Sequence, residues 1–437
     1  MDNFHSRVAS FFSKYDFNIA GQQIDVSVRA LSEDLQLGLK GGNEGAPEMI
    51  PTWITPAMEA PKNKRVIVID AGGTNFRSFL VEFDMEGKAK ICKSAKSLMP
   101  ALDREYGREE FFDKIAEYLE YLRDEAEQIN FSFSYAVKIT PNIDGEVIRF
   151  SKEIKAKKVL GSLLGDSLMC ALAKRGWSRV KRVCVLNDTT AALLSGCLPA
   201  LSVQHKEYSS YVGVILGTGF NIAYIENHSI PKLGDKAKLP QVIVSEIGKS
   251  DKVAVSKFDK ALYNETSDGD VCKLEKMCSG AYLGKLISIV IRAACRNRLF
   301  SDSFCEAFDN ADYNFPEINN FLCHVNLEQN SLASVIKSSK GSDTDIDVLR
   351  RLADTVLKRT ARIVASSLAS VCIKSGKGKE SGKPICIIAE GTTFDKGFGL
   401  KDEISKLLYE YLTVKMGIYF EIKQLENCVA LGAAVCG

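Results

Sequence analysis

The hydrophobic pattern divides the chain into short apolar strands and longer amphipathic helices. Apolar runs bounded by glycine, asparagine or aspartate predict strands. They lie at residues 66–81 (two strands and a turn), 88–94, 131–137, 146–150, 182–186, 211–216, 221–225, 242–245, 385–389 and 419–423. Apolar positions at helical spacing predict helices at residues 24–39, 108–128, 159–174, 283–298, 345–373 and 428–434. We expect irregular structure at 309–342 and a surface loop at 374–383.

The order strand, glycine turn, strand occurs twice in the sequence. Residues 66–81 read VIVIDAGGTNFRSFLV, and residues 211–225 carry a second turn at Gly217-Thr218-Gly219. A third strand and helices follow each copy, and a strand that ends at Asn187-Asp188 separates the copies. This duplication predicts two related α/β domains that face a cleft.

The first turn has the residues of an anion site. Gly72 and Gly73 permit a sharp turn with uncovered amides, which bind anions. Asp70 ends the preceding strand, where a carboxylate can hold hydrated Mg²⁺. Candidate donors to phosphate oxygens are Thr74, Asn75 and Arg77. A hairpin with a solvated tip would use the same residue types, so both interpretations stay open.

Asn187 and Asp188 follow a buried strand and directly precede a helix. Helix capping explains both residues, because Asn and Asp are favoured at helix starts. Catalysis is the other interpretation, since phosphoryl transfer needs a carboxylate to orient the acceptor hydroxyl. Taken singly, the other polar candidates fit ordinary surface or strand-end positions. These are Ser151, Lys152, Asn221, Glu246 and Glu275.

Composition and charge exclude several classes of function and partner. A chain of 437 residues has room for about two or three domains. The formal net charge is +2 without a long basic run, so we expect neither nucleic acid nor a membrane as partner. The thirteen cysteines are scattered and no signal pattern or membrane-length apolar run occurs, which favours reduced thiols in the cytoplasm. No Walker A or Rossmann fingerprint is present, and any metal is expected to be oxygen-bound.

Seven segments, in order, resemble the motifs of the hexokinase/glucokinase family from residue 50 onward. They are VIVIDAGGTNFR, INFSFSYAV with IRFSKEIKA, VLNDTTAAL, GVILGTGFNIAYIE, IVSEIG, KLEKMCSGAYLGKL and AEGTTFDK. The resemblance implies a two-domain α/β protein with the actin-like ATPase (ribonuclease H-like) fold. The small domain is expected at 64–187 plus 424–437, and the large domain at 1–63 plus 188–423. A hexose, with glucose expected, would bind between them and be phosphorylated by ATP with Mg²⁺ at its 6-hydroxyl.

Residue by residue, the resemblance makes Asp188 the general base. It assigns the binding of sugar hydroxyls to Ser134, Ser151, Lys152, Asn187, Asn221, Glu246 and Glu275. It assigns phosphate or metal contacts to Asp70 (on Mg²⁺ through water), Gly72, Gly73, Thr74, Asn75, Arg77, Gly217 and Thr218. Gly391 and Thr392 would lie near the adenosine.

The sequence departs from the family pattern at several points. Tyr135 stands where the family usually has proline, and Ser151-Lys-Glu-Ile replaces threonine followed by Lys-Gly-Phe. Ile247 replaces a tryptophan or similar residue, and residues 427–431 replace a glycine- and serine-rich turn. These departures allow an alternative, a hexokinase-like sugar sensor with little turnover. An actin- or chaperone-type ATPase would share the phosphate turns but would not need the SKE, SEIG and LEKM segments together. The zinc-containing bacterial sugar kinases are disfavoured because their CxCGxxGC cluster is missing.

Overall fold

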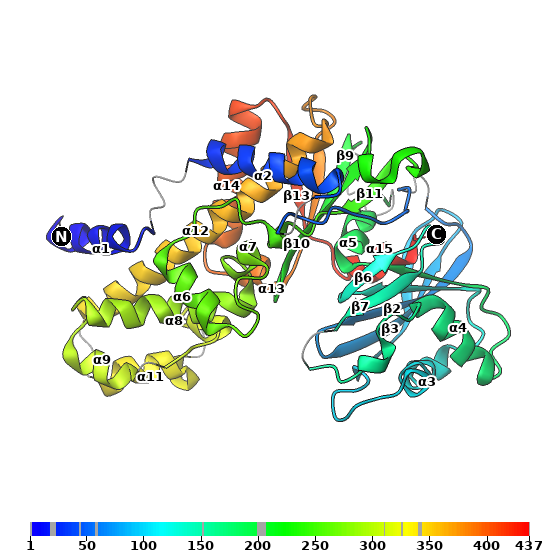
Figure 1. The fold of residues 1–437 in the computed structure, drawn as a ribbon, viewed down its shortest axis with the longest axis horizontal. Helices are drawn as coiled ribbons and strands as arrows, with labels where there is room; N and C mark the ends of the chain where they lie inside the picture. Colours follow the sequence, from blue (N-terminus) through cyan, green and yellow to red (C-terminus); the bar gives the residue numbers. More distant parts are fainter. Residues whose placement is uncertain are drawn as a thin grey trace.

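The computed structural model describes residues 2–17, 23–42, 45–56, 60–150, 153–198, 207–309, 311–324, 327–339 and 343–436. Two large sheets organise these residues (Figure 1). The first sheet contains β2 (Lys64–Gly72), β3 (Asn75–Phe83), β4 (Ala89–Leu98), β5 (Gln128–Phe133) and β8 (Arg182–Leu186). The second contains β1 (Ile50–Pro51), β9 (Ser210–Leu216), β10 (Phe220–Glu226), β11 (Gln241–Val244), β12 (Ile385–Glu390) and β13 (Phe420–Lys423). A separate hairpin pairs β6 (Ala136–Ile139) with β7 (Gly145–Arg149).

The two sheets share one topology. The first has the order β4-β3-β2-β5-β8, and the second has β11-β10-β9-β12-β13 with β1 added at its edge. In each sheet, three antiparallel strands are followed by two strands that pair in parallel. The duplication predicted from the sequence is therefore confirmed at the level of strand order.

Helices cover both faces of the first sheet. One face packs on α3 (Arg108–Tyr118) and α4 (Leu164–Lys174) through a core that includes Phe111, Phe112 and Leu168. The other face packs on α5 (Asp188–Gly196) and α15 (Cys428–Ala434).

Helix α5 lies against both sheets and against α15 at close range. A Cβ atom on Gly432 of α15 would lie 1.8 Å from the Ala191 carbonyl oxygen of α5. A Cβ atom on Gly213 of β9 would lie 2.4 Å from the Thr189 carbonyl oxygen, again on α5. Only glycine fits at such distances, so these two residues set how closely α5 packs against its neighbours.

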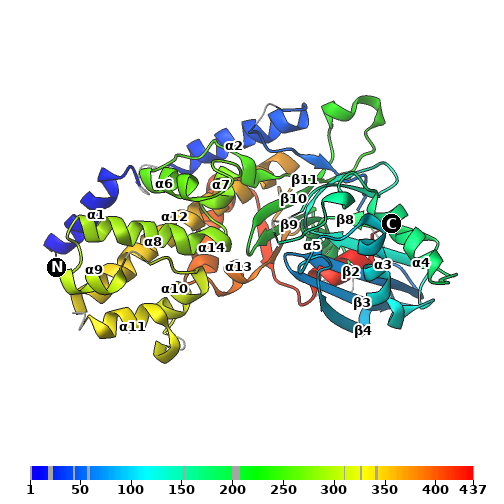
Figure 2. The same cartoon turned by 60° about the horizontal axis from the view of Figure 1, so that its bottom comes forward.

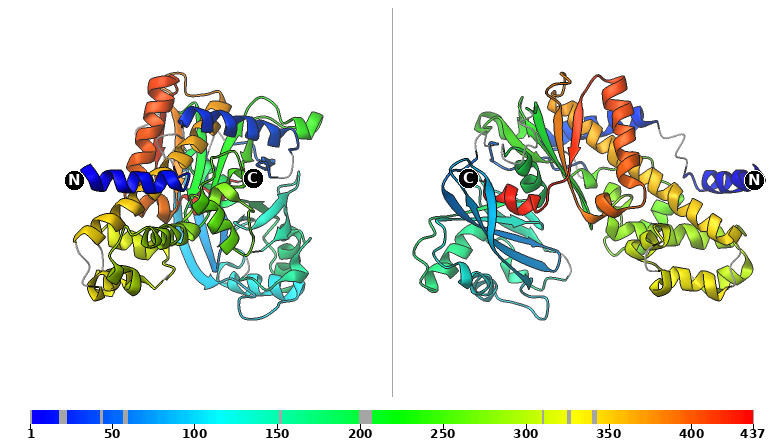
Figure 3. Two further views of the ribbon diagram at one scale, coloured as in Figure 1. Left: turned by 60° about the vertical axis from the view of Figure 1, so that its left-hand side comes forward. Right: turned by 180° about the vertical axis from the view of Figure 1, so that it is seen from behind.

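The second sheet adjoins a helical region that forms the opposite end of the molecule (Figures 1 and 2). The longest helix, α12 (Asp343–Ser375), crosses this region and packs against α2 (Ile24–Leu39), α8 (Gly280–Arg296) and α14 (Leu400–Leu408). Figure 3 shows the same arrangement from two further sides. The remaining helices are α1 (Asp2–Lys14), α6 (Lys257–Glu265), α7 (Lys273–Lys276), α9 (Asp302–Phe308), α10 (Phe315–Leu322), α11 (Ser331–Ser338) and α13 (Thr392–Lys396). No helix within the described ranges is long and apolar enough to cross a membrane.

Three predicted elements are wrong in extent or number. The helix predicted at 108–128 ends at Tyr118, because a 3₁₀ turn follows it and Gln128 already begins β5. The helix predicted at 159–174 begins at Leu164, after a separate 3₁₀ turn. The strand predicted at 131–137 is two strands, β5 and β6, which belong to different sheets.

Several helices were also missed. The region expected to be irregular, 309–342, contains α10 and α11. Helices α1, α6, α7 and α9 lie in stretches for which no helix was predicted.

Candidate active site

The turn between β2 and β3 is a two-residue loop formed by Gly73 and Thr74. Gly72 pairs with Asn75 at its base, and Gly73 has a φ of 59°. This left-handed conformation is strained for most residues with a side chain, so glycine is favoured here. A Cβ on Gly72 would lie 2.9 Å from Ser134 Oγ, so Ser134, a predicted sugar contact, packs directly on the predicted phosphate turn.

Asp70 and Arg77 form an ion pair behind this turn. Arg77 Nη2 lies 2.6 Å from Asp70 Oδ2, and the two residues are cross-strand partners on β2 and β3. Burial raises the pKa of Asp70 to about 6 even though Arg77 opposes the shift, and the negative charges of Asp188 and Glu390 raise it further. Asp70, Asp188 and Glu390 therefore lie close enough to interact, although they come from three different strand ends.

Asn187 is the N-cap of α5, and Asp188 is the first residue of the helix. Asn187 Oδ1 accepts a hydrogen bond from Thr189 N at 2.9 Å, so the capping interpretation is correct for Asn187. Asp188 Oδ1 accepts from the same Thr189 N at 2.7 Å and from Thr189 Oγ1 at 3.1 Å. Its carboxylate is thus held in one orientation at the end of β8, beside Asp70.

The second turn, Gly217 to Gly219, is bound by backbone hydrogen bonds to the start of α8. Gly280 N donates to Gly217 O at 2.8 Å, and Ala281 N donates to Thr218 O at 3.1 Å. Gly391 also packs on this turn, because a Cβ there would lie 2.7 Å from Gly217 N. The segment that begins with Gly391 and Thr392 is therefore adjacent to the second predicted phosphate turn.

Three predicted sugar contacts come together beside this turn. Asn221 Nδ2 donates to Glu246 Oε1 at 2.5 Å, and Asn221 Oδ1 accepts from Glu246 N at 3.0 Å. Glu275 Oε2 accepts from Phe220 N at 2.9 Å. Burial raises the pKa of Glu246 to about 7 and also raises the pKa of Glu275. Of the other four predicted contacts, Ser134 packs on the first turn and Asn187 caps α5. Ser151 and Lys152 lie outside the described residues.

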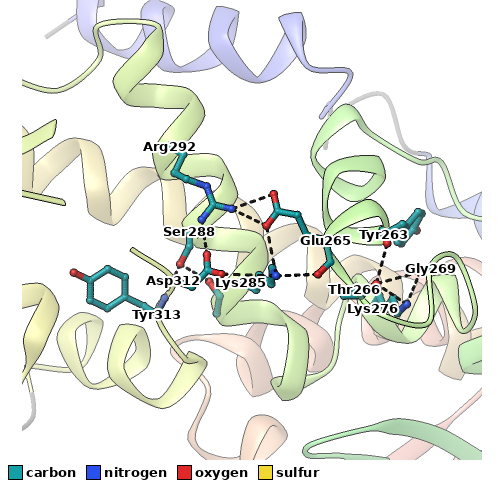
Figure 4. Close-up of polar contacts among 11 residues, drawn as sticks. Tyr263, Glu265, Thr266, Gly269, Lys276, Lys285, Ser288, Arg292, Asp312 and Tyr313 are labelled. Atoms are coloured by element: carbon teal, nitrogen blue, oxygen red, sulfur yellow. Dashed lines mark hydrogen bonds and ion pairs between the residues drawn. The ribbon is translucent and has the colours of Figure 1, made fainter. Parts of the chain in front are cut away.

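A buried lysine supports the short helix α7, which carries Glu275. The Lys276 ammonium is fully buried and donates to Thr266 Oγ1 at 2.9 Å, Asp268 Oδ1 at 2.8 Å and Gly269 O at 2.5 Å (Figure 4). It therefore binds the loop between α6 and α7 to the helix that carries Glu275.

The same loop is anchored at the end of α6. Arg292 of α8 binds Glu265 at 2.9 Å and also pairs with Asp312 (Figure 4). Lys285 lies 3.5 Å from Glu265 and 3.7 Å from Asp312. The loop before Glu275 is thus fixed by ionic contacts at both of its ends.

The sequence reasoning missed three residues of this region. Glu390 ends β12, so the strand-end argument applied to Asp70 would have found it. Lys276 gave no such signal, and Tyr135 stood out only as a departure from the family pattern, because their hydrogen-bond partners lie elsewhere in the sequence. Tyr135 Oη donates to Gly73 O at 2.5 Å and so reaches the first turn.

A pocket of about 630 Å³ lies elsewhere, between α3 and α4. Its charged side chains largely pair with one another or with neighbours, as Lys174 does with Glu109 and Arg175 with Asp113. It includes none of the predicted site residues. We therefore place the candidate active site at the two turns and the strand ends beside them.

Comparison with known proteins identifies the family of this chain. Two family models, both described as hexokinase, match residues 12–198 and 211–437. Hexokinase-1 of Schizosaccharomyces pombe is 26% identical over 418 residues, covering 90% of this chain and 83% of that protein. Hexokinase of Schistosoma mansoni is 30% identical over 276 residues, covering 60% of this chain and 59% of that protein.

A solved structure of hexokinase from Schistosoma mansoni complexed with glucose has the same fold. Its TM-score is 0.79 at 22% identity, and the alignment covers 99% of this chain and 98% of that one. The two duplicated sheets are those of the actin-like ATPase fold predicted from the sequence. Because the family models match both halves of the chain, this protein belongs to the hexokinase family of sugar kinases.

Proposed function

We propose that this hexokinase-family enzyme transfers the γ-phosphoryl group of ATP to the 6-hydroxyl of glucose, with Asp188 as general base. The observation that carries the proposal is the convergence of Asp188 and Asp70. Strands β2 and β8 flank β5 in parallel, and Asp70 and Leu186 both lie opposite Ser132, so Asp188 follows at the same edge of the sheet as Asp70. The charge of Asp188 accordingly contributes to the raised pKa of Asp70. One carboxylate would take the hydroxyl proton, and the other would face the metal and phosphates.

The geometry of Asp188 suits a base. Its Oδ1 atom is held by the backbone and hydroxyl of Thr189, which fixes the plane of the carboxylate. A hydroxyl bound in front of it would lose its proton as the oxygen attacks the γ-phosphorus. A fixed orientation lowers the reorganisation that proton transfer requires.

The sugar would be held by Asn221, Glu246 and Glu275, with Ser134, Ser151, Lys152 and Asn187 as further contacts. Carboxylate oxygens accept hydrogen bonds from hydroxyls, and the amide of asparagine can both donate and accept. The mutual hydrogen bonds of Asn221 and Glu246 already order two of these groups.

The nucleotide would bind to the two turns. The first offers Gly72, Gly73, Thr74, Asn75 and Arg77, and the second offers Gly217 and Thr218, with Gly391 and Thr392 towards the adenosine. Asp70 is a single carboxylate, and within the described part of the chain no group of three or more His, Cys, Asp or Glu side chains is arranged to hold a metal ion by itself. One carboxylate suits a Mg²⁺ ion that keeps its water shell and arrives with ATP.

We further propose that residues 64–187 plus 424–437 form a small domain and residues 1–63 plus 188–423 a large one. Each contains one of the duplicated sheets. The sugar would bind between them, and closure would exclude water that competes with the sugar as phosphoryl acceptor.

Asp188→Asn tests the base directly. The asparagine can still accept from Thr189 N, so the helix start is preserved while the proton acceptor is lost. We expect kcat with glucose and Mg·ATP to fall by about 10²–10⁴, with the melting temperature and glucose affinity nearly unchanged. A coupled assay for ADP and a calorimetric titration with glucose measure these quantities.

Asn187→Ala is the matched control for a capping role. It should cost about 0.5–2 kcal/mol of folding stability through the lost cap. A folded Asp188→Asn variant with near-normal kcat would refute the mechanism. A wild-type protein that binds glucose yet releases almost no ADP would favour the sugar-sensor alternative.

A further inference from the structure

The two carbonyl groups of the first phosphate turn are held by residues distant in sequence. Met99 N donates to Thr74 O at 3.0 Å, and Tyr135 Oη donates to Gly73 O at 2.5 Å. A peptide unit is planar and trans, so its C=O and N–H bonds point in opposite directions. A hydrogen bond that fixes the carbonyl of Gly73 therefore also fixes the direction of the Thr74 N–H.

Tyr135 is itself rigidly placed. Its side chain is buried, and its ring packs on Phe133 and Phe150 with centroids 4.8 Å and 5.3 Å away. The residue before it is also fixed, because Ser134 N donates to Ala71 O at 3.0 Å. Burial raises the pKa of Tyr135 above its ordinary value, so the hydroxyl keeps its proton and can donate.

We propose that Tyr135 is a positioning residue for the nucleotide. Its hydroxyl holds the Gly73–Thr74 peptide so that the Thr74 N–H faces the phosphate groups of ATP. The inference rests on the proposed role of this turn in phosphate binding. Proline, which the family usually has here, has no hydroxyl for this hydrogen bond.

The same residue joins the two substrate sites. Ser134, a proposed sugar contact, fills the space beside Gly72, and Tyr135 binds the next residue of the turn. The segment 134–135 therefore lies directly against the phosphate turn. Because an oriented backbone amide stabilises an anion, loss of the tyrosine hydroxyl should weaken nucleotide binding more than sugar binding.

Tyr135→Phe removes only this hydroxyl, and Tyr121→Phe is its matched control. Tyr121 Oη donates to Ser78 O at 3.0 Å, on β3 of the same hairpin but away from the turn. For each variant, the quantities to measure are KM for ATP, kcat, the melting temperature, the affinity for a non-hydrolysable Mg·ATP analogue, and the affinity for glucose alone. Tyr135→Phe should raise KM for ATP and the Kd of the analogue by about three- to tenfold, whereas the glucose Kd stays within about twofold. Tyr121→Phe removes a hydrogen bond that does not contact the turn, so it should change both nucleotide constants by less than about twofold.

Two outcomes overturn the role of Tyr135. One is an unchanged analogue affinity in Tyr135→Phe. The other is an equal loss of nucleotide affinity in both variants with matching falls in melting temperature, which would assign the effect to general stability of the hairpin. The proposed function is judged separately, on wild-type turnover. If the wild type phosphorylates no hexose, that function fails, whereas normal turnover with an unaffected Tyr135→Phe variant removes only the role of Tyr135.

Discussion

Glu246, a proposed sugar contact, lies in an environment that is unfavourable for a carboxylate. It has a φ of 54°, a conformation that is strained for a residue with a side chain, and burial raises its pKa to about 7. Lys249 and the amide of Asn221 oppose this shift, whereas Glu48 and Glu275 add to it. A carboxylate in these surroundings is stabilised in its charged form by a ligand that donates hydrogen bonds, as sugar hydroxyls do.

This balance predicts a pH dependence of glucose affinity. Above about pH 7 Glu246 is ionised and accepts hydrogen bonds, whereas below that pH it is protonated in the sugar-free protein. Glucose Kd should therefore rise as pH falls from 8 to 6, by up to about tenfold per unit below the pKa if only the ionised form binds. Titration calorimetry between pH 6 and 8 measures the glucose Kd. A Kd that does not change with pH would remove Glu246 from the sugar site.

Glu246→Gln supplies the complementary stability prediction. A raised pKa in the folded state gives a stabilising contribution that is present at acidic pH and is lost as pH rises through about 7. Glutamine resembles the protonated form, so the variant should melt higher than wild type at pH 8 without sugar, and about equally at pH 5. Its glucose affinity should be weaker at pH 8 and independent of pH. A lower melting temperature at pH 8 would contradict the assignment.

At the scale of elements, short α7 depends on contacts outside itself. Four residues cannot form a stable helix alone, because helix nucleation is costly. The buried Lys276 ammonium provides the missing stabilisation by binding three oxygen atoms of the preceding loop. The backbone that follows α7 then bonds to Gly217 and Thr218, so one segment positions both Glu275 and the second predicted phosphate turn.

Lys276→Met tests this dependence. Loss of the buried ammonium removes three hydrogen bonds to the loop, one of them to a carboxylate, which should cost about 1–3 kcal/mol of unfolding free energy. It should also reduce the rise in melting temperature on adding glucose, because Glu275 is then less well held. Urea denaturation and a thermal shift series measure the two effects.

Lys273→Met on the same helix is the control. Lys273 lies 3.0 Å from Asp270, whose side chain is 71% exposed. Such a surface pair is screened by solvent and contributes little, so stability and the response to glucose should stay close to wild type. Equal effects of the two substitutions would show that the burial of Lys276 has no special role.

At the scale of the molecule, segments distant in sequence link the duplicated sheets. Strand β1 pairs with β11 of the second sheet, and two residues later Trp53 packs against the core of the first. Helices α5 and α15 lie in contact with each other beside both sheets. A rotation between the sheets would therefore change the surroundings of Trp53.

We expect glucose to close the molecule. Small-angle scattering should show a smaller radius of gyration at saturating glucose, and the fluorescence of Trp53 should change in parallel. The only other tryptophan, Trp177, is buried in the core of the first sheet and serves as the internal reference. A Trp53→Phe variant should lose the fluorescence change and keep the change in scattering. Identical scattering curves with and without glucose would exclude closure.

The sequence alone determined the features that depend on local order. Glycines beside strand ends predicted both turns, and the repeated strand–turn–strand pattern predicted two similar sheets. Some local signals were present but overlooked, since Asn314 and Glu317 form the capping box that begins α10 in the region expected to be irregular. The helix predicted to reach residue 128 was too long because Leu119 and Leu122 continue the apolar spacing while the backbone changes to a 3₁₀ turn.

Only the tertiary structure decided which polar groups meet. Tyr135 bonds to a carbonyl 62 residues away, and Glu246 bonds to Asn221 25 residues away. Asp70, Asp188 and Glu390 interact although they end strands of two different sheets. Local periodicity sets which face of an element is buried, but packing of the two sheets through α5 and α15 sets which strand ends become neighbours. For that reason the sequence identified the turns, and the fold identified the residues that orient them.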